Sequence, residues 1–185
     1  MKVLLINGSP HQRGCTYTVL SEAGTALNEE GFKTDFYWIG NKPIGGCIGC
    51  FQCTKKQKCV FDDTVNEFTA LAAEYDGFIF GSPVYYSGMN GSLMSFMDRI
   101  FFSASAQEPH PFRFKPAAAV VSARRSGTTS ALDQMNKYFS HQQMPIVTSR
   151  YWNMVHGANA EQAKQDLEGM QNMRILARNM AWHLK

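Results

Sequence analysis

The chain has 185 residues, of which 44% are hydrophobic and 18% charged, and its formal net charge is +3. This composition excludes a disordered chain, and the length suits one domain with a complete core. The basic residues are mostly scattered and no apolar run is long enough to cross a bilayer, so we expect neither a nucleic-acid nor a membrane partner. We predict a single cytoplasmic domain over residues 1–185, whose five cysteines are thiols or metal ligands rather than disulfides.

A strand, a loop and a helix are predicted at the start of the chain. An apolar run over residues 3–6 indicates a buried strand, and apolar residues recur at helical spacing from Leu20 to Leu27. The loop between them would direct the free amides and the dipole of a helix N-terminus at one point, which stabilises an anion. Its candidate contributors are Gly8, Ser9, His11, Arg13, Gly14 and Thr16. The loop lacks the spacing of dinucleotide and triphosphate loops, so it either binds a single phosphate monoester or forms an ordinary turn.

Strand and helix patterns then alternate along the chain, with no repeat or linker. Further strands are predicted over residues 33–39, 77–81, 117–121 and 145–148. Further helices are predicted from a capping box at Thr64–Glu67, within residues 93–101 and 132–139, and from about Glu161. The last of these is expected to bury Leu167. The alternation predicts an α/β fold, with a parallel sheet covered by helices on both faces.

Gly- and Ser-rich segments follow the predicted strands one, three and four. In a doubly wound sheet of order 2-1-3-4-5 these strands are neighbours, and a ligand binds outside their carboxyl ends. One ligand could therefore contact all three loops. Its phosphate would lie at residues 9–16, while residues 83–87 and 123–127 would hold a flat group.

Motifs in the first two of these segments and in the helix that follows the second resemble those of the flavodoxin-like NAD(P)H-dependent FMN reductases. They are Gly8-Ser9-Pro10, Arg13-Gly14-Cys15-Thr16, Ser82-Pro83-Val84-Tyr85-Tyr86, Gly91-Ser92-Leu93 and Phe96-Met97-Asp98-Arg99. The resemblance implies a flavodoxin-like three-layer sandwich with a five-stranded parallel sheet, bound FMN, and NAD(P)H as electron donor. It also implies that the FMN-binding residues are Ser9, His11, Arg13, Gly14, Cys15 and Thr16 at the phosphate, Pro83, Val84, Tyr85, Tyr86 and Ser87 at the ring, and Ser122, Ala123, Arg124 and Gly127 on the other side.

Alternatives remain for some of these side chains. Tyr85 and Tyr86 would either contact the flavin or anchor their loop. Arg124 would stabilise negative charge at the flavin N1–O2 side, or form with Arg125 a solvated pair or a site for the 2′-phosphate of NADPH. Cys15, next to a helix N-terminus, is predicted to have a lowered thiol pKa.

A loop at residues 41–60 holds four of the five cysteines, namely Cys47, Cys50, Cys53 and Cys59. Their close spacing resembles ferredoxin-type ligation of a 4Fe-4S cluster, in which one short loop reaches four irons. Within the FMN reductases, this loop is most similar to that of the iron-sulfur flavoproteins. Zinc, which more often uses two separated Cys-x-x-Cys pairs, and a loop of metal-free thiols are the alternatives.

The predicted function is an FMN-dependent NAD(P)H oxidoreductase that passes electrons through bound flavin to a small-molecule or protein acceptor. Flavin carries this chemistry, so no catalytic side chain is predicted, only residues that place the ring. The alternative is an iron-sulfur flavoprotein, or a non-enzymatic flavin electron carrier or redox sensor, that uses the four-cysteine loop. A site at the strand ends of one small domain leaves a flavin face open unless another subunit covers it, so we expect a homodimer or homotetramer.

Overall fold

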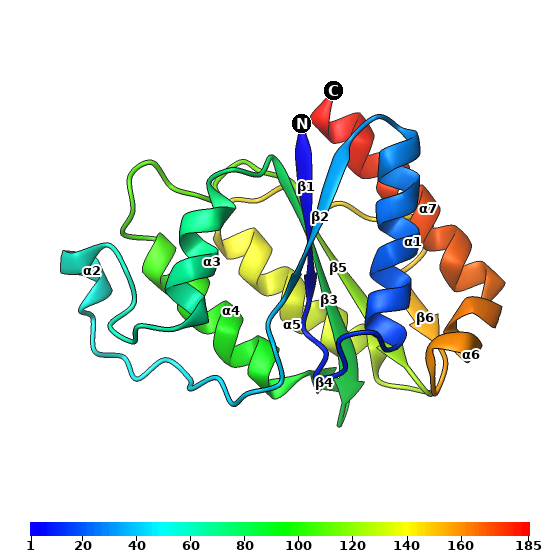
Figure 1. Cartoon of the computed structure of the whole chain (residues 1–185), viewed down its shortest axis with the longest axis horizontal. Helices are drawn as coiled ribbons and strands as arrows, with labels where there is room; N and C mark the ends of the chain where they lie inside the picture. The colour runs from blue at the N-terminus through cyan, green and yellow to red at the C-terminus, as the bar shows by residue number, and fades with distance from the viewer.

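The computed structural model describes all of residues 1–185 and is built around a central parallel sheet (Figure 1). Its parallel strands are β1 (Lys2–Asn7), β2 (Lys33–Trp38), β3 (Gly77–Tyr85), β5 (Ala117–Ala123) and β6 (Met154–His156). They lie in the order β2-β1-β3-β5-β6, and the short β4 (Gly88–Met89) pairs antiparallel with the end of β3. The predicted order 2-1-3-4-5 is confirmed when the parallel strands are counted alone.

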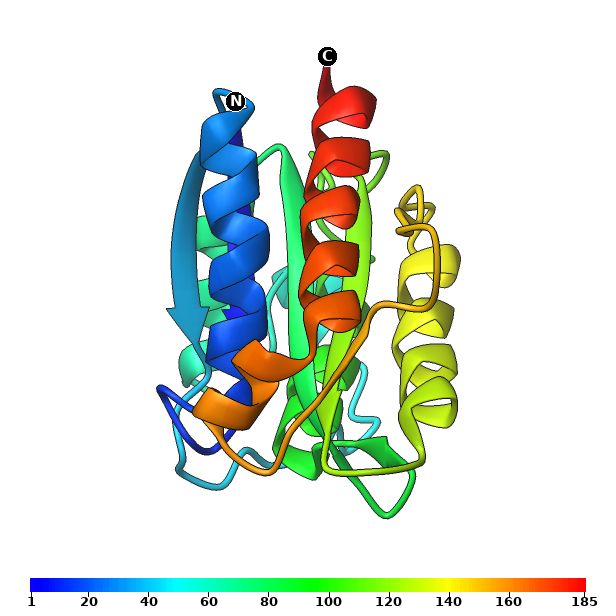
Figure 2. The same ribbon diagram turned by 90° about the vertical axis from the view of Figure 1, so that its right-hand side faces the viewer.

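Helices cover both faces of this sheet and complete a three-layer sandwich (Figure 2). One face carries α1 (Cys15–Glu29), α6 (Ala160–Gln165) and α7 (Leu167–Leu184), and the other carries α3 (Thr64–Ala72), α4 (Gly91–Ala104) and α5 (Thr128–His141). The short helix α2 (Cys53–Lys56) lies within the cysteine loop, at one end of the molecule. No helix combines the length and the apolar character that a membrane span requires.

The core is divided by the sheet into two buried clusters, one under each helical layer. Successive residues of β1 alternate between them, because side chains of a strand point to opposite faces. Leu4 and Ile6 pack with the α3, α4 and α5 side, whereas Val3 and Leu5 pack with the α1 and α7 side. This explains why the first strand is apolar at every position.

The fifth parallel strand lies later in the chain than predicted. Residues 145–148 make only an isolated bridge, between Ile146 and Ala117, whereas the strand proper is β6. The chain leaves the sheet between the two, and the buried Asn153 spans the interruption by donating from Nδ2 to the Ala119 oxygen at 3.0 Å. A side-chain amide thus replaces a backbone partner, which an apolar pattern does not reveal.

Two helix starts also differ from the prediction. α3 is capped by Asp63 rather than Thr64, because the Asp63 carboxylate accepts from a first-turn amide. The last helical segment is divided at Asp166, which ends α6 and caps α7 by accepting from Gly169 N at 3.0 Å. Leu167, which was expected to be buried, is therefore the first residue of α7 and is 78% exposed.

Candidate functional site

A cleft of about 270 Å³ opens where β1, β3 and β5 end. The register of the sheet places Asn7 beside Gly81 and Pro83 beside Ser122, so the loops that follow these strands meet at one edge. Most of the predicted cofactor residues line this cleft, namely Ser9, His11, Gly14, Cys15, Thr16, Pro83, Val84, Tyr85, Ser122, Ala123 and Arg124. The topology thus brings together three segments that are far apart in the sequence.

One wall of the cleft was missed by the sequence analysis. Gly157 and Ala158 line it from the turn after β6. They follow the true fifth strand, so the strand-end rule would have found them if that strand had been placed correctly. The predicted residues that do not line the cleft are Arg13, Tyr86, Ser87 and Gly127.

The N-terminus of α1 faces the cleft. This helix begins after Gly14 without a side-chain cap, and no carbonyl accepts from the amides at its first three positions. Thr16 Oγ1 and Ser122 Oγ lie 2.9 Å apart and link the first and third loops. Arg13 and Arg124 are exposed and neither has an acidic partner. Free amides, hydroxyls and unpaired positive charge are what a phosphate requires.

Asn7, a buried residue that the sequence analysis did not single out, shapes the loop before α1. Its Oδ1 accepts from Ser9 N at 3.0 Å, and its Nδ2 donates to the Gln12 oxygen at 3.0 Å. The indole of Trp38, on the neighbouring β2, donates to the Ser9 oxygen at 2.8 Å. These bonds fix the loop backbone, so the amides of α1 keep one direction. The available signal was a polar residue directly at the end of an apolar strand.

The second loop is a tight hairpin rather than an open loop. β3 continues to Tyr85 and turns back into β4 through Tyr86 and Ser87, which have φ of 49° and 61°. Two positive φ values are the pattern of a type I′ turn, which favours Gly, Asn or Asp, so this turn is strained. Gly127 in the third loop, with φ of 92°, lies so close that an added Cβ would be 2.8 Å from Ser87 Cα. The turn and the third loop therefore support each other beside the cleft.

Cys15 does not have the lowered pKa that was predicted. Burial raises the pKa of its thiol, and this outweighs the opposite effect of its backbone hydrogen bond. The thiol also lies 3.6 Å from the Gly157 oxygen, to which it donates. The loss of water around the sulfur thus destabilises a thiolate more than the helix N-terminus stabilises it.

The four cysteines of the 41–60 loop line a second, smaller pocket, between that loop and α4. Cys53 is buried, Cys59 is half-buried, and Cys47 and Cys50 are exposed. Burial raises the pKa of the Cys53 thiol, and the negative charge of the other three thiolates adds to the rise. Four thiolates at this place would therefore require compensating positive charge, which iron or zinc supplies.

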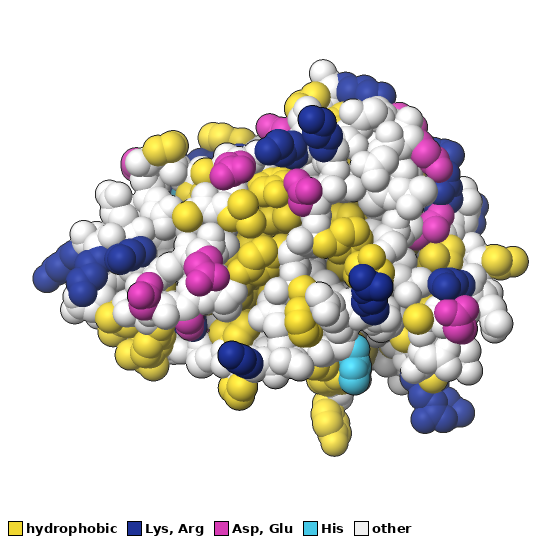
Figure 3. All heavy atoms as spheres, in the orientation of Figure 1, with side chains coloured by type: hydrophobic (Ala, Val, Ile, Leu, Met, Phe, Trp, Pro, Cys, Tyr) yellow, Lys and Arg dark blue, Asp and Glu magenta, His cyan; other side chains and the backbone are white.

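The four thiols of this pocket form a donor set that a 4Fe-4S cluster or a zinc ion uses. No three His, Cys, Asp or Glu side chains converge on one point that would hold a metal ion. Zinc needs four ligands within about 2.3 Å of one centre, whereas each thiolate of a cubane cluster binds its own iron. Phe51, Phe61 and Phe102 form part of the surrounding wall. Figure 3 shows hydrophobic side chains gathered at this end of the molecule beside a group of lysine or arginine side chains.

A buried arginine packs against the fourth cysteine. Arg99 of α4 donates from Nε and from Nη2 to Cys59 Sγ, at 3.3 Å each, and binds both carboxylate oxygens of Asp63 at 2.7 and 2.8 Å. Burial acts to lower the pKa of Arg99, but its bonds to Asp63 and Cys59 outweigh this and raise it. Arg99 belongs to one of the family motifs, but the sequence alone predicted no role for it.

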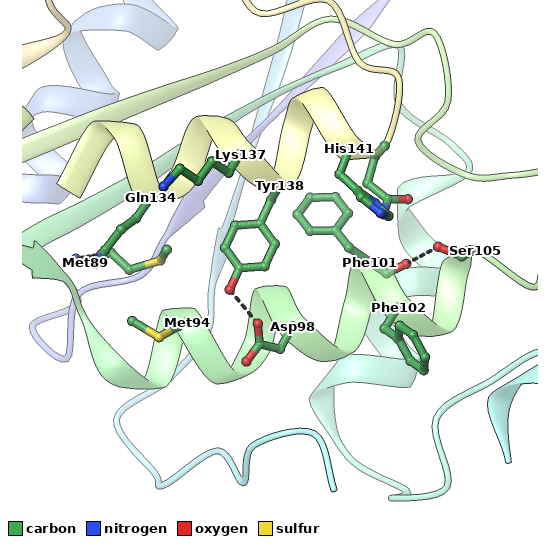
Figure 4. Close-up of a pocket in the computed structure, with 11 residues that line it drawn as sticks. Met89, Met94, Asp98, Phe101, Phe102, Ser105, Gln134, Lys137, Tyr138 and His141 are labelled. Atoms are coloured by element: carbon green, nitrogen blue, oxygen red, sulfur yellow. Dashed lines mark hydrogen bonds between the residues drawn. The ribbon is translucent and has the colours of Figure 1, made fainter. Parts of the chain in front are cut away.

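A third cavity, of about 480 Å³, lies between α4 and α5 and contains no predicted site residue (Figure 4). Tyr138 and Asp98 point toward each other in it, and the Tyr138 hydroxyl donates to the Asp98 carboxylate. Burial and this bond raise the pKa of Tyr138. Phe102 borders both this cavity and the cysteine pocket, so the two lie next to each other.

A parallel sheet of this order, with an uncapped helix N-terminus and a cleft across three strand ends, defines a flavodoxin-like protein whose ligand site lies at the strand ends. The NADPH-dependent FMN reductase family matches the chain over residues 1–159, and the chain belongs to that family. The resemblance inferred from the motifs is therefore confirmed.

The chain is similar to several iron-sulfur flavoproteins. One from Methanocaldococcus jannaschii is 34% identical over 98% of this chain and 96% of its own length. One from Archaeoglobus fulgidus is 29% identical over 95% of this chain and 93% of its own.

Two solved structures illustrate the likeness in fold. RosB with bound 8-demethyl-8-formylriboflavin-5'-phosphate matches with a TM-score of 0.77 and 12% identity, over 100% of this chain and 79% of its own. An NADH:FMN oxidoreductase in its apo form matches with a TM-score of 0.68 and 14% identity, over 100% of this chain and 90% of its own. At these identities the matches show the fold.

Proposed function

We propose that this chain is an iron-sulfur flavoprotein, which binds FMN in the cleft and a 4Fe-4S cluster at Cys47, Cys50, Cys53 and Cys59. The observation that carries the proposal is that all four cysteines line one pocket in a member of the FMN reductase family. The similarity to iron-sulfur flavoproteins over nearly the whole chain supports it. Bound FMN supplies hydride and single-electron transfer, and a cluster supplies single-electron transfer.

The residues of the cleft would hold FMN in two parts. The first-turn amides of α1, with the hydroxyls of Ser9 and Thr16, would bind the phosphate. Pro83–Tyr85 on one side and Ala123–Arg124 on the other would hold the ring. The positive charge of Arg124 would stabilise the negative charge of reduced flavin.

A second candidate role is the direct oxidation of NAD(P)H, which the description of the matching family favours. The electrons would then leave to a small-molecule or protein acceptor. Lys55, Lys56 and Lys58 are exposed in the loop that carries the cysteines. Their charge favours an acidic acceptor, because complementary charge accelerates association.

Quantification of flavin, iron, acid-labile sulfide and zinc in anaerobically purified protein tests the proposal. We expect flavin together with iron and sulfide. Flavin with zinc, or flavin without metal after iron and sulfide reconstitution, would contradict the cluster. Failure to bind added FMN would contradict the assignment of the cleft. Oxidation of NADPH or NADH with an added quinone tests the second role separately.

Two cysteine variants localise the metal. Cys53→Ser is expected to lose most of its iron and of the cluster absorbance while it keeps its flavin. Cys15→Ser is the matched control, because Cys15 is the one cysteine outside the pocket and lies at the cleft instead. Equal iron contents in the two variants would place the cluster elsewhere.

A further inference from the structure

We propose that Arg99 sets the reduction potential of the cluster by donating two hydrogen bonds to the sulfur of Cys59. This inference rests on the proposed cluster at the four cysteines. Arg99 would not touch the iron itself. It acts on the cluster only through its hydrogen bonds to the sulfur of Cys59, and it is therefore a positioning residue.

The Arg99 side chain is held in one orientation by all of its donors. A guanidinium has five N–H groups, and Arg99 makes five hydrogen bonds. Two go to Cys59 Sγ, two go to the Asp63 carboxylate, and one goes to the Gly45 oxygen at 3.2 Å. The side chain is 1% exposed, and the ring of Phe61 lies 4.8 Å from the guanidinium carbon. Water therefore screens the charge of Arg99 little.

The four cysteines differ in the hydrogen bonds that their sulfurs accept. Cys59 is the one whose sulfur accepts hydrogen bonds from a charged side chain, and the sulfurs of Cys47, Cys50 and Cys53 make no side-chain hydrogen bond. Asp63 offsets part of the positive charge, but its side chain is 38% exposed and so is better screened than Arg99. The field at Cys59 is consequently dominated by the guanidinium.

The charge of Arg99 is expected to raise the reduction potential of the cluster. A cluster bound at these cysteines would gain one negative charge when an applied potential reduces it by one electron, and this charge would spread over the core and its thiolates. Charge-assisted N–H bonds to a ligand sulfur stabilise this more negative state. Arg99 therefore raises the potential, and its replacement by a neutral residue lowers it.

Redox titration of the reconstituted protein, followed by the electron paramagnetic resonance signal of the reduced cluster, tests this inference. At a fixed applied potential, Arg99→Gln is expected to lower the ratio of reduced to oxidised cluster at least tenfold, or about 59 mV for one electron. Arg99→Lys keeps the charge but not the paired bonds, so it should fall between wild type and Arg99→Gln. The flavin potentials, measured in the same titration, should not move.

Asp63→Asn is expected to raise the reduction potential of the cluster, whereas Arg99→Gln lowers it. It removes the offsetting negative charge, while asparagine still caps α3 and still accepts a bond from Arg99. The ratio of reduced to oxidised cluster should therefore rise. Loss of the Asp63 charge raises this ratio by itself, so Arg99→Lys, which keeps the charge and loses the paired bonds, tests the bonds to Cys59 if Arg99→Gln does not fold.

Asn66→Ala is the structural control. Asn66 holds the main chain of Cys59 on both sides, accepting from its N at 2.9 Å and donating to its oxygen at 3.1 Å, and it does not touch the sulfur. This variant should lower the iron content and leave the potential of the retained cluster unchanged. An unchanged potential in Asp63→Asn and in the Arg99 variants would overturn the inference. A wild-type protein that binds no cluster would instead overturn the proposed function.

Discussion

Among single residues, Thr16 gives the most direct test of the cleft. Thr16→Val keeps the shape of the side chain and removes the hydroxyl that is hydrogen-bonded to the Ser122 hydroxyl. We expect the Kd for FMN to rise by about 10- to 150-fold, because a hydrogen bond to a charged group contributes about 1.5–3 kcal/mol. Quenching of flavin fluorescence measures this Kd.

The matched control for Thr16→Val is Thr25→Val on the same helix. Thr25 is exposed, and its hydroxyl donates only to the Ser21 oxygen at 3.0 Å. The control should bind FMN as wild type does. If Thr16→Val also binds with unchanged affinity, the phosphate does not lie at the start of α1.

Tyr75 should make the stability of the fold depend on pH at the alkaline end. Burial, followed by its hydrogen bond to Asp35, raises the pKa of Tyr75 from 10.0 to about 12. Since the folded pKa is above the unfolded one, the stabilisation is complete below about pH 10 and is lost as the pH rises toward about 12. Urea unfolding at about pH 9 and about pH 11 measures the loss. Tyr75→Phe should lose less stability over this interval than wild type, and an equal loss would contradict the assignment.

Among contacts between elements, the tightest is the one between the turn after β3 and the loop after β5, where Gly127 lies against Ser87. Gly127→Ala places a Cβ at a positive φ, 2.8 Å from Ser87 Cα. We expect the free energy of unfolding to fall by about 1–3 kcal/mol and FMN occupancy to fall with it. Gly91→Ala at the start of α4 is the control, because nothing lies within 4 Å of an added Cβ there. It should leave stability unchanged or raise it by up to about 1 kcal/mol.

Elements with a continuous apolar signal were predictable, and those set by single polar side chains were not. β1 and β3 are apolar because both faces are buried, and the periodic face of α4 packs on the sheet, so both signals identified the right segments. β6 depends on Asn153, and the start of α7 depends on Asp166. The role of Asn153 arises from a contact with another strand, and that of Asp166 from a cap bond to Gly169 three residues on, and hydrophobic periodicity shows neither.

The same distinction holds for the sites. The strand-end rule needs only the order of the strands, so it grouped the three loops of the cleft correctly. Cysteine spacing grouped the four cysteines that line one pocket, and the metal that it predicts there stays a prediction. Arg99, which donates to the sulfur of Cys59, lies on α4, 40 residues along the chain from that cysteine. A pairing of this kind requires the tertiary structure.

For the molecule as a whole, we propose a homodimer or homotetramer in solution. Large apolar side chains around the two sites are exposed: Ile48 is 65% exposed, Phe51 is 62% exposed, and Tyr86 at the turn beside the cleft is fully exposed. Cover by another chain would remove these side chains from water and close the open side of the cleft. Sedimentation velocity of the FMN-loaded protein is expected to show a dimer or tetramer, and a stable monomer would contradict the proposal.

The cysteine loop is held in place at Cys59 but not at Cys47 and Cys50, and this difference affects how a cluster would be assembled in it. The main chain and the sulfur of Cys59 are both fixed, whereas Cys47 and Cys50 stand in solvent. At the proposed cluster site, iron and sulfide would therefore enter from solvent at Cys47 and Cys50, whereas Cys59 is already held in position.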